Sequence, residues 1–465
     1  MDDETCQALE LACSCQKAPT LEPGITGRYS AVAAIPSGLV ASAYENTFGD
    51  LLFLSADYSD LTKIRKEIVD GVPATAPTHP VGGWRGGISD PGNNVGTHTD
   101  IGIAANGTPV IAYHDVTNKS LKFANKSGKS WNIHTIALPQ AASKQVTGEY
   151  VSLLFVNAKP AIAFTTFNIR ENNGSFASEV LWATTTKEIP TSEADWQIST
   201  IARGPMACSN LCESSEACFV NENGSTQCKT VAAGCTACTS NEACLAGNCA
   251  PILKNLSFEG VPDAFGLWTS AVLTSNGPLV VFHDSVNGTL NAAILRDSNW
   301  KSAVLKGAPT NRMGAFCSAA ADLNGTKVHV TYQHVVENSL RYAQIDLSTL
   351  AVTLSETIDN GQRADGLHPV GADSAVITDT SGSVIVFYQD QQNADLLMAK
   401  RIGPNQWTPD SMGDPNLGRL LLGGPRACGF YTDLVFFNNL LYGSTFFFDI
   451  QAAQKGNLQF FVTAP

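Results

Sequence analysis

Two stretches of the chain place a histidine directly before an aspartate at the end of an apolar run. Residues 109–124 read PVIAYHDVTNKSLKFA, and residues 278–293 read PLVVFHDSVNGTLNAA. An imidazole next to a carboxylate serves in general acid–base catalysis and in metal binding. Because the two stretches are so similar, the pair could instead belong to a structural unit that the chain repeats.

The second interpretation is supported by a frame that recurs along the chain. Each copy begins with a glycine, continues with a short apolar strand and a turn, and then has a second apolar strand and a third. The seven copies begin at Gly27, Gly96, Gly148, Gly266, Gly314, Gly371 and Gly429. Seven copies of four strands predict an all-β fold, a seven-bladed β-propeller. A β-sandwich array or two separate β domains are the alternatives.

Two long segments interrupt the frame. Residues 69–95 separate the first two copies, and a Cys-rich segment separates the third and fourth. We expect a Cys-containing tail at residues 1–26, blades one to three at 27–202, a disulfide-rich insertion at 203–263 and blades four to seven at 264–465. The third and seventh copies also have long loops between their second and third strands. In a propeller these segments would gather on one face, which is therefore the candidate site.

The composition excludes several classes of function. The net charge is −13 without any basic run, so the phosphate backbone of a nucleic acid would be repelled. The chain has no continuous apolar stretch of the length that a membrane-spanning helix needs, so no transmembrane segment is expected.

Eight of the 13 cysteines lie within residues 208–249, in two groups of four. A segment with so few apolar residues needs disulfides for its order, although Cys-x2-Cys is also a zinc-binding spacing. We expect disulfides, and the pairing within each group remains open among three possibilities. The cysteines concerned are Cys208, Cys212, Cys218, Cys228, Cys235, Cys238, Cys244 and Cys249.

Disulfides indicate an oxidising compartment. We therefore expect a secreted, periplasmic or cell-surface protein from which a signal peptide has been removed. Cys6, Cys13 and Cys15 precede the first blade, while Cys317 and Cys428 lie in blades five and seven. A disulfide between the tail and a blade is one expectation, and the odd total leaves one thiol over.

The frame resembles blades that are common in secreted bacterial proteins, of the form PxISYYDxxxxxLKYA followed by a Trp. The second cysteine group resembles short modules that are frequent in secreted myxobacterial proteins, of the form CxxCxxxxxCxxGxC. The likeness covers most of residues 27–465 and implies a propeller with a disulfide-rich insertion. It implies no activity, because propellers carry many unrelated functions.

The two positions of the His-Asp pair can be followed from blade to blade. The second position is a turn-forming residue in most copies, so we interpret Asp115, Asp284 and Asp390 as residues that start a loop by hydrogen bonding to backbone N–H groups. His334 is the exception at that position. In this alignment blade one contributes Glu45 and Asn46 to the two positions, and blade seven contributes Gly443 and Ser444.

The first position of the pair is polar but variable. Imidazole and amide groups arranged around a channel mouth can bind a divalent metal, which is the possible cofactor. Hydrogen bonding to neighbouring loops is the alternative. The candidate metal ligands are His114, His283 and Gln333, together with His334.

A third column lies two residues after each initial glycine and is mostly aromatic. First strands line the channel of a propeller, so these side chains could form an aromatic mouth that stacks on sugar rings. Packing against the next blade is the alternative. The predicted ligand-binding residues are Tyr29, His98, Tyr150, Trp268, Asp373 and Tyr431, and Phe316 occupies the column in the fifth copy. Nearby arginines that could hold a carboxylate, or be solvated loop charges, are Arg28, Arg85, Arg312, Arg363 and Arg426.

Three functions are compatible with these features. The first is an exported adhesin or lectin-like protein that recognises a glycan or a surface protein. The second is a polysaccharide-active enzyme of the lyase type that uses the same face, with or without a metal. The third is a cell-surface scaffold that makes contact through its Cys-rich insertion. A bound metal would favour the enzyme, whereas retention of a glycan without turnover would favour the lectin.

Overall fold

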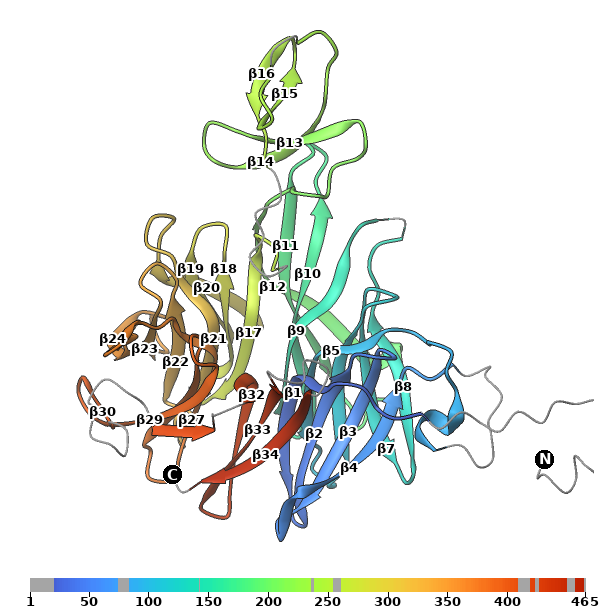
Figure 1. Ribbon diagram of the computed structural model, residues 1–465, viewed down its shortest axis with the longest axis vertical. Coiled ribbons are helices and arrows are strands. Elements are labelled where there is room, and N and C mark those ends of the chain that lie inside the picture. Colours follow the sequence, from blue (N-terminus) through green and yellow to red (C-terminus); the bar gives the residue numbers. More distant parts are fainter. Residues whose placement is uncertain are drawn as a thin grey trace, which may run out of the picture.

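The chain forms an all-β propeller of seven blades, which confirms the predicted fold (Figure 1). The structure is a computed structural model that describes residues 21–73, 83–141, 143–235, 238–253, 261–408, 419–422, 426–449 and 456–463. No α-helix occurs among these residues, and none of them forms a helix that is long and apolar enough to cross a membrane.

Each blade is an antiparallel sheet in which consecutive strands pair. Blade one contains β1(Thr26–Ile35), β2(Gly38–Glu45), β3(Asp50–Asp57) and β4(Asp60–Asp70). Blade two contains β5(Val95–Ile103), β6(Pro109–Asp115), β7(Ser120–Ser127) and β8(Ser130–Ala137). Blade three contains β9(Val146–Val156), β10(Lys159–Arg170), β11(Phe176–Thr185) and β12(Trp196–Met206).

The second half of the ring continues the pattern. Blade four contains β17(Phe265–Thr274), β18(Gly277–Asp284), β19(Thr289–Arg296) and β20(Asn299–Gly307), and blade five contains β21(Met313–Ala321), β22(Lys327–His334), β23(Ser339–Asp346) and β24(Val352–Asp359). Blade six contains β27(Val370–Thr378), β28(Val384–Asp390), β29(Asp395–Gly403) and β30(Gln406–Trp407), and β31(Arg419–Leu422) also pairs with β29. The described part of blade seven is β32(Arg426–Phe437), β33(Leu440–Asp449) and β34(Gly456–Thr463).

Short elements lie between the blades. These are the 3-10 turn η1(Trp84–Gly87) and the small hairpin of β25(Gln362–Arg363) and β26(Gly366–Leu367). A second 3-10 turn, η2(Glu193–Asp195), lies within blade three between β11 and β12.

The first strands of the blades surround a central channel. Their order is β1, β5, β9, β17, β21, β27 and β32, and β32 lies against β1 to close the ring. At the start of each first strand the chain passes closely over the preceding blade. A Cβ atom on Gly148 would lie 2.7 Å from Leu121 Cα, and one on Gly27 would lie 2.7 Å from the backbone N of Leu458. The initial glycine is therefore needed for close packing between blades, including the joint between blades seven and one.

Both faces of a blade are buried against neighbours. Between blades one and two, for example, Leu51 and Phe53 pack with Ile111 and Tyr113 in one buried cluster. Because neither sheet face contacts water, the strands carry apolar runs rather than a clean alternation. This explains why an apolar run precedes the polar residues of each second strand.

The Cys-rich module, residues 208–253, rises from the joint between blades three and four (Figure 1). The chain leaves and returns at one point, since the Ala207 N–H donates to the Asp263 carbonyl over 2.8 Å. The module contains two hairpins, β13(Glu216–Val220) with β14(Thr226–Thr230) and β15(Glu242–Leu245) with β16(Asn248–Pro251).

Four disulfides hold the module, which confirms the expected framework. They link Cys208 to Cys218, Cys212 to Cys228, Cys235 to Cys244 and Cys238 to Cys249. Within each group the first cysteine pairs with the third and the second with the fourth. Cys6, Cys13 and Cys15 lie outside the described residues.

Candidate functional site: the channel ring and the Cys-rich module

Seven side chains, one from each blade, form a ring around the channel, which we call the channel ring. Neighbouring ring centroids lie 4.8 Å apart for Tyr29 and His98, 4.6 Å for His98 and Tyr150, and 4.6 Å for Trp268 and Phe316. The ring centroids of Tyr150 and Trp268 lie 5.9 Å apart, and those of Tyr29 and Tyr431 lie 4.8 Å apart, which completes the aromatic arc. The members are Tyr29, His98, Tyr150, Trp268, Phe316, Asp373 and Tyr431.

A backbone irregularity turns these side chains toward the axis. All seven have a left-handed conformation, with φ between 46° for Asp373 and 54° for Tyr29, and the glycine two residues before each also has a positive φ. The pairing of first and second strands shifts at this point, for example between Thr97 and Asp100 in blade two. A bulky residue in this conformation costs roughly 1–3 kcal/mol, so the surrounding structure must impose it. Because it recurs in every blade, this bulge belongs to the blade architecture, and the sequence pattern had not revealed it.

Hydrogen bonds between blades hold the backbone of the channel ring. In four blades, the side chain of the residue after the ring member donates to the carbonyl of the ring member in the preceding blade. Ser30 Oγ donates to Tyr431 O over 3.0 Å, and Ser374 Oγ donates to Phe316 O over 3.0 Å. Cys317, which is buried and not part of a disulfide, donates its thiol to Trp268 O over 3.1 Å. The ring is thus positioned from outside, while its own side chains face the channel.

Two buried aspartates lie two residues further along the first strands of blades two and seven. Asp100 accepts the Leu153 N–H at 2.6 Å, and Asp433 accepts the Val32 N–H at 2.8 Å, so each joins its blade to the next. Burial raises the pKa of Asp100 to about 8, with a further contribution from the charge of Asp433, and burial raises the pKa of Asp433 to about 6. Near neutral pH this part of the channel therefore binds a proton readily.

Glu149 and His98 lie side by side at the channel ring. Glu149 Oε2 is 3.8 Å from His98 Nε2, and their side chains are 23% and 17% exposed. Burial lowers the pKa of His98 to about 3 and raises the pKa of Glu149 to about 7. Since the imidazole is neutral at physiological pH, the contact is not an ion pair.

The tyrosine hydroxyls converge on the same space. Those of Tyr29 and Tyr431 hydrogen-bond to each other, and burial raises the pKa of both phenols. The charges of Glu149 and Asp373, which come from blades three and six, also raise the pKa of Tyr29 in blade one. Groups from across the ring are therefore close enough to act on one ligand.

The His-Asp pair has a different role. Asp115 accepts the Asn118 N–H and its side-chain amide, each at 2.9 Å. Asp284 accepts the N–H groups of Val286 and Asn287, both at 3.0 Å, and the side-chain amide of Asn287 at 2.7 Å. These contacts, and the equivalent contacts of Asp390, confirm that the aspartates initiate the loop after the second strand.

The predicted metal ligands lie in blades two, four and five and contact nearby polar groups. His114 Nδ1 lies 3.0 Å from Thr97 Oγ1, and His283 Nδ1 lies 3.2 Å from Thr289 O. Gln333 donates across the joint between blades to Val370 O over 3.0 Å, as Gln389 does to Cys428 O. We looked for groups of three His, Cys, Asp or Glu side chains whose ligand atoms lie within 4.8 Å of one another. Within the described ranges there are two such groups, and both consist of disulfide cysteines. Metal binding stays a prediction.

His334 acts as a turn residue despite its different chemistry. Its Nδ1 accepts the Glu337 N–H at 3.2 Å, which is the contact that the carboxylate of Asp115 makes in blade two. The expectation that His334 departs from the turn role is therefore wrong. Its Nε2 lies 3.6 Å from Glu337 Oε1 at the surface.

Strand register corrects the frame in blades one and seven. Glu45 pairs with Thr26 as Asp115 pairs with Val95, so Glu45 occupies the turn-forming position and accepts the Phe48 N–H at 2.8 Å. In blade seven Ser444 pairs with Asp433, which places Gly443 and Ser444 well inside the strand. Short apolar repeats gave no local signal for these shifts.

Two of the rim arginines are buried anchors rather than solvated charges. Arg85 donates to Asp50 at 2.8 Å, and both side chains are fully buried. Its guanidinium also donates to Ile88 O over 2.7 Å, which holds the segment between blades one and two in place. Arg363 pairs with Asp359 at 2.7 Å beside the β25–β26 hairpin.

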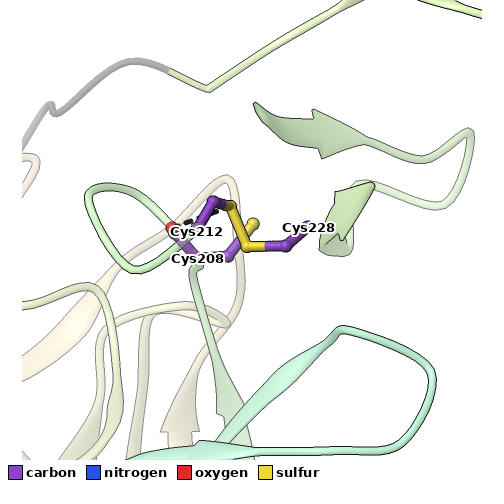
Figure 2. Close-up of side chains that lie close together, drawn as sticks. All are labelled: Cys208, Cys212 and Cys228. Carbon is purple, nitrogen blue, oxygen red and sulfur yellow. Dashed lines mark hydrogen bonds between the residues drawn. A yellow bond between two sulfur atoms is a disulfide. The ribbon is translucent and has the colours of Figure 1, made fainter. Parts of the chain in front are cut away.

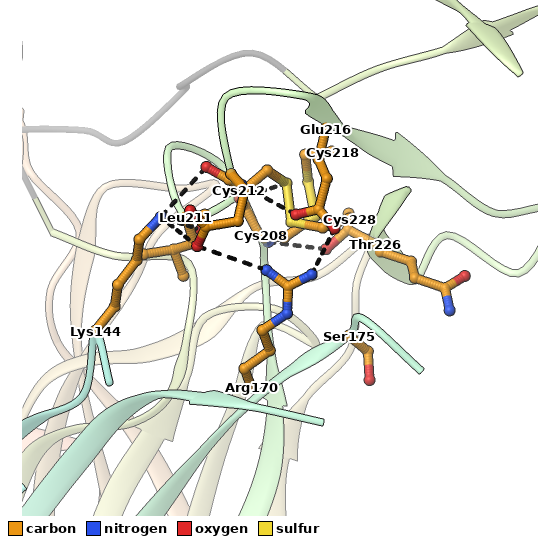
Figure 3. The surroundings of a disulfide bond; sticks show 12 residues. Lys144, Arg170, Ser175, Cys208, Leu211, Cys212, Glu216, Cys218, Thr226 and Cys228 are labelled. Atoms are coloured by element: carbon orange, nitrogen blue, oxygen red, sulfur yellow. Dashed lines mark hydrogen bonds and ion pairs between the residues drawn. A yellow bond between two sulfur atoms is a disulfide. The ribbon is translucent and has the colours of Figure 1, made fainter. Parts of the chain in front are cut away.

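The Cys-rich module sits on blade three next to the channel ring. Figure 2 shows Cys208, Cys212 and Cys228 close together at the base of the module. In Figure 3, Arg170 at the end of β10 reaches Glu216 over 2.6 Å, and Lys144 donates to Leu211 O over 2.8 Å.

The buried base of the module is continuous with the ring. Cys208, Cys218 and Cys228 belong to one apolar cluster, against which the ring residues Tyr150 and Trp268 pack. The base of the module and these two ring residues therefore share one apolar cluster at the joint between blades three and four.

No protein-family model and no curated protein matches the sequence. Solved structures with a similar arrangement include an α-L-arabinofuranosidase from Fusarium graminearum, with 12% identity over 79% of this chain and 92% of that chain and a TM-score of 0.42. AofleA from Arthrobotrys oligospora has 11% identity over 87% and 89% of the two chains and a TM-score of 0.37. A polysaccharide lyase has 7% identity over 98% and 94% and a TM-score of 0.49. Likenesses this distant assign no activity.

Proposed function

We propose that the protein is an exported binding protein that recognises a glycan at the channel ring, beside the Cys-rich module. The observation that carries this proposal is the convergence of seven side chains, one per blade, in a closed arrangement of aromatic faces, hydroxyls and carboxylates. Aromatic faces stack on the apolar C–H faces of sugars, and the interspersed polar groups bond to sugar hydroxyls. The four disulfides support an oxidising compartment such as the cell exterior or the periplasm.

The hydrogen-bond pattern supports a binding role for the ring rather than for the His-Asp pair. Donors and acceptors of the pair are used by turns and blade joints, as for Asp284 and Gln333. Neighbouring side chains of the ring contact one another and remain partly exposed. Groups that are held in place and still accessible are suited to contact a ligand.

The test is glycan-array screening of the full chain, followed by calorimetry with the best oligosaccharide. Trp268→Ala should weaken binding at least about tenfold, since truncating a central aromatic contact costs about 2 kcal/mol or more. Trp131→Ala is the matched control, because Trp131 packs at the outer edge of blade two with its Nε1 donating to Glu67. Unchanged affinity in a folded Trp268→Ala protein would exclude the ring as the binding site.

One observation favours a catalytic alternative at the same place. Glu149 has a pKa raised to about 7 and lies beside His98 and within electrostatic reach of Tyr29. A carboxylate that titrates near neutrality suits a general acid or base, as a polysaccharide lyase or hydrolase requires. Release of shortened or unsaturated oligosaccharides, abolished in Glu149→Gln, would establish the enzyme; retention of intact oligosaccharide would favour the lectin.

A scaffold role for the module and a surface protein as partner also remain proposals. The module stands above the propeller, and its second hairpin lies furthest from the blades (Figure 1). If this role is correct, deletion of the module should abolish a cell-surface assembly and leave glycan binding intact.

A further inference from the structure

We propose that the ligand of the channel ring carries a protonated amino group on a sugar, that is, a hexosamine with a free amine. This inference rests on the proposed glycan-binding function and specifies its substrate class. Three features carry it: the excess of carboxylates at the ring, the position of Glu149 beside a neutral His98 and the ring of aromatic faces.

The lining of the ring has the wrong charge for an anionic sugar and the right charge for a cationic one. Glu149 and Asp373 lie at the ring itself, and Asp433 lies two residues after Tyr431. Asp100 adds little negative charge at neutral pH, because burial raises its pKa to about 8. Arg28 is the positive charge that acts on Tyr29 and Tyr431, and it is exposed at the rim, 6.0 Å from the ring of Phe446. A uronate would meet this carboxylate excess and be repelled.

Glu149 is the group most in need of a cationic partner. Its carboxylate lies 3.8 Å from the imidazole of His98. Burial lowers the pKa of His98 to about 3, so this imidazole is neutral at physiological pH. Burial also raises the pKa of Glu149 to about 7, and in the described part of the chain the ionic contact of its carboxylate is with this neutral imidazole. An ammonium group next to the carboxylate would supply a cationic partner, with a charge-assisted hydrogen bond.

The aromatic members of the ring favour the same ligand. A cation close to the face of a Tyr or Trp ring is stabilised by the negative charge density of that face, and more strongly when the cation is desolvated. Tyr29, Tyr150 and Trp268 lie in one continuous arc with His98 between the first two. The same faces can stack on the sugar ring that bears the amine.

The polar groups distinguish an amino sugar from a quaternary ammonium ligand. The ring contains tyrosine hydroxyls, a neutral imidazole and the carboxylate of Asp373, with Glu149 beside His98, which suits several hydroxyl groups and an N–H donor. A quaternary ammonium has no N–H to donate and would leave these acceptors without a hydrogen bond, which disfavours its binding.

The experiment compares three oligosaccharides of equal length by calorimetry at neutral pH: glucosamine, N-acetylglucosamine and glucose oligomers. We expect the glucosamine oligomer to bind at least about tenfold more tightly than the other two. Equal or tighter binding of the acetylated or neutral oligomer overturns the amine preference and leaves glycan binding at the ring standing. If none of the three binds while another glycan does, the preference is likewise overturned, and if no glycan binds, the proposed function fails as well.

Variants locate the preference within the ring. Glu149→Gln should reduce the ratio of glucosamine to glucose affinity to about threefold or less in a folded protein. Glu188→Gln is the matched control at an exposed surface position and should keep the full ratio. Asp373→Asn tests the second carboxylate of the ring in the same way. If the ratio of glucosamine to glucose affinity is undiminished in both ring variants, recognition of the amine by these carboxylates is excluded.

Discussion

The channel ring and the His-Asp pair are both repeated around the propeller, yet they differ in how their side chains are used. Around the pair, Asp284 accepts three hydrogen bonds from its own loop, and Gln389 reaches across a blade joint. At the ring, the backbone is held by hydroxyls of the next blade, and the side chains point into the channel. Recurrence of a residue type therefore does not separate structural from ligand-binding positions. The hydrogen-bond partners of its side chain do.

The largest effect on stability is expected at the pair. Asp284→Ala removes a buried acceptor and leaves the N–H groups of Val286 and Asn287 without their partner, at a cost of about 2–4 kcal/mol in the free energy of unfolding. Denaturant unfolding measures the loss, and Glu188→Ala at the surface is the control. If Asp284→Ala instead abolishes ligand binding and leaves stability unchanged, the assignment of a structural role to the His-Asp pair and a binding role to the channel ring is wrong.

A smaller loss is expected at the joint between blades six and seven. Gln389→Ala removes the donor to Cys428 O, which lies 2.7 Å away, and should cost about 1–2 kcal/mol. Gln389→Glu keeps the size of the side chain but has no N–H to donate, so its loss should be at least as large. A stable Gln389→Glu protein in thermal unfolding would show that packing, not the hydrogen bond, stabilises the joint.

At the ring, the expected effect is a pH dependence. Glu149 has a folded-state pKa raised to about 7, so its protonated form stabilises the fold below pH about 4.5, and this contribution is lost as pH rises through about 7. His98 acts oppositely, because its lowered pKa favours the fold as pH rises toward 6.5. The free energies of unfolding of wild type and Glu149→Gln are measured by denaturant unfolding over this pH range. As pH rises from about 4.5 to about 7, wild type should lose stability relative to the variant.

The smallest effect is expected at His334. Aspartate occupies the equivalent position in blades two, four and six and accepts the same loop N–H groups. His334→Asp should therefore change the free energy of unfolding by no more than about 0.5 kcal/mol and leave ligand binding intact. A loss of bound metal or activity in this variant would revive the metal-ligand interpretation of His334.

Much of the fold could be predicted because each blade repeats the same local requirements. Glycines at the blade joints, apolar second and third strands and turn-forming Asp residues are chemical signals that any copy carries alone. The cysteine spacing likewise predicted a disulfide module, but the choice of pairing required the hairpins that bring Cys218 opposite Cys228 and Cys244 opposite Cys249.

By itself the sequence determined the number of blades, the aromatic column and the cluster of cysteines, because these follow from residue type and spacing. Tertiary structure alone decided which columns face the channel. Two residues after each initial glycine, a left-handed bulge turns the side chain toward the axis, and closure of the ring by Gly27 against Leu458 brings Tyr29 next to Tyr431. Those two residues are 402 positions apart in a chain of 465, so no local pattern could indicate that they would meet.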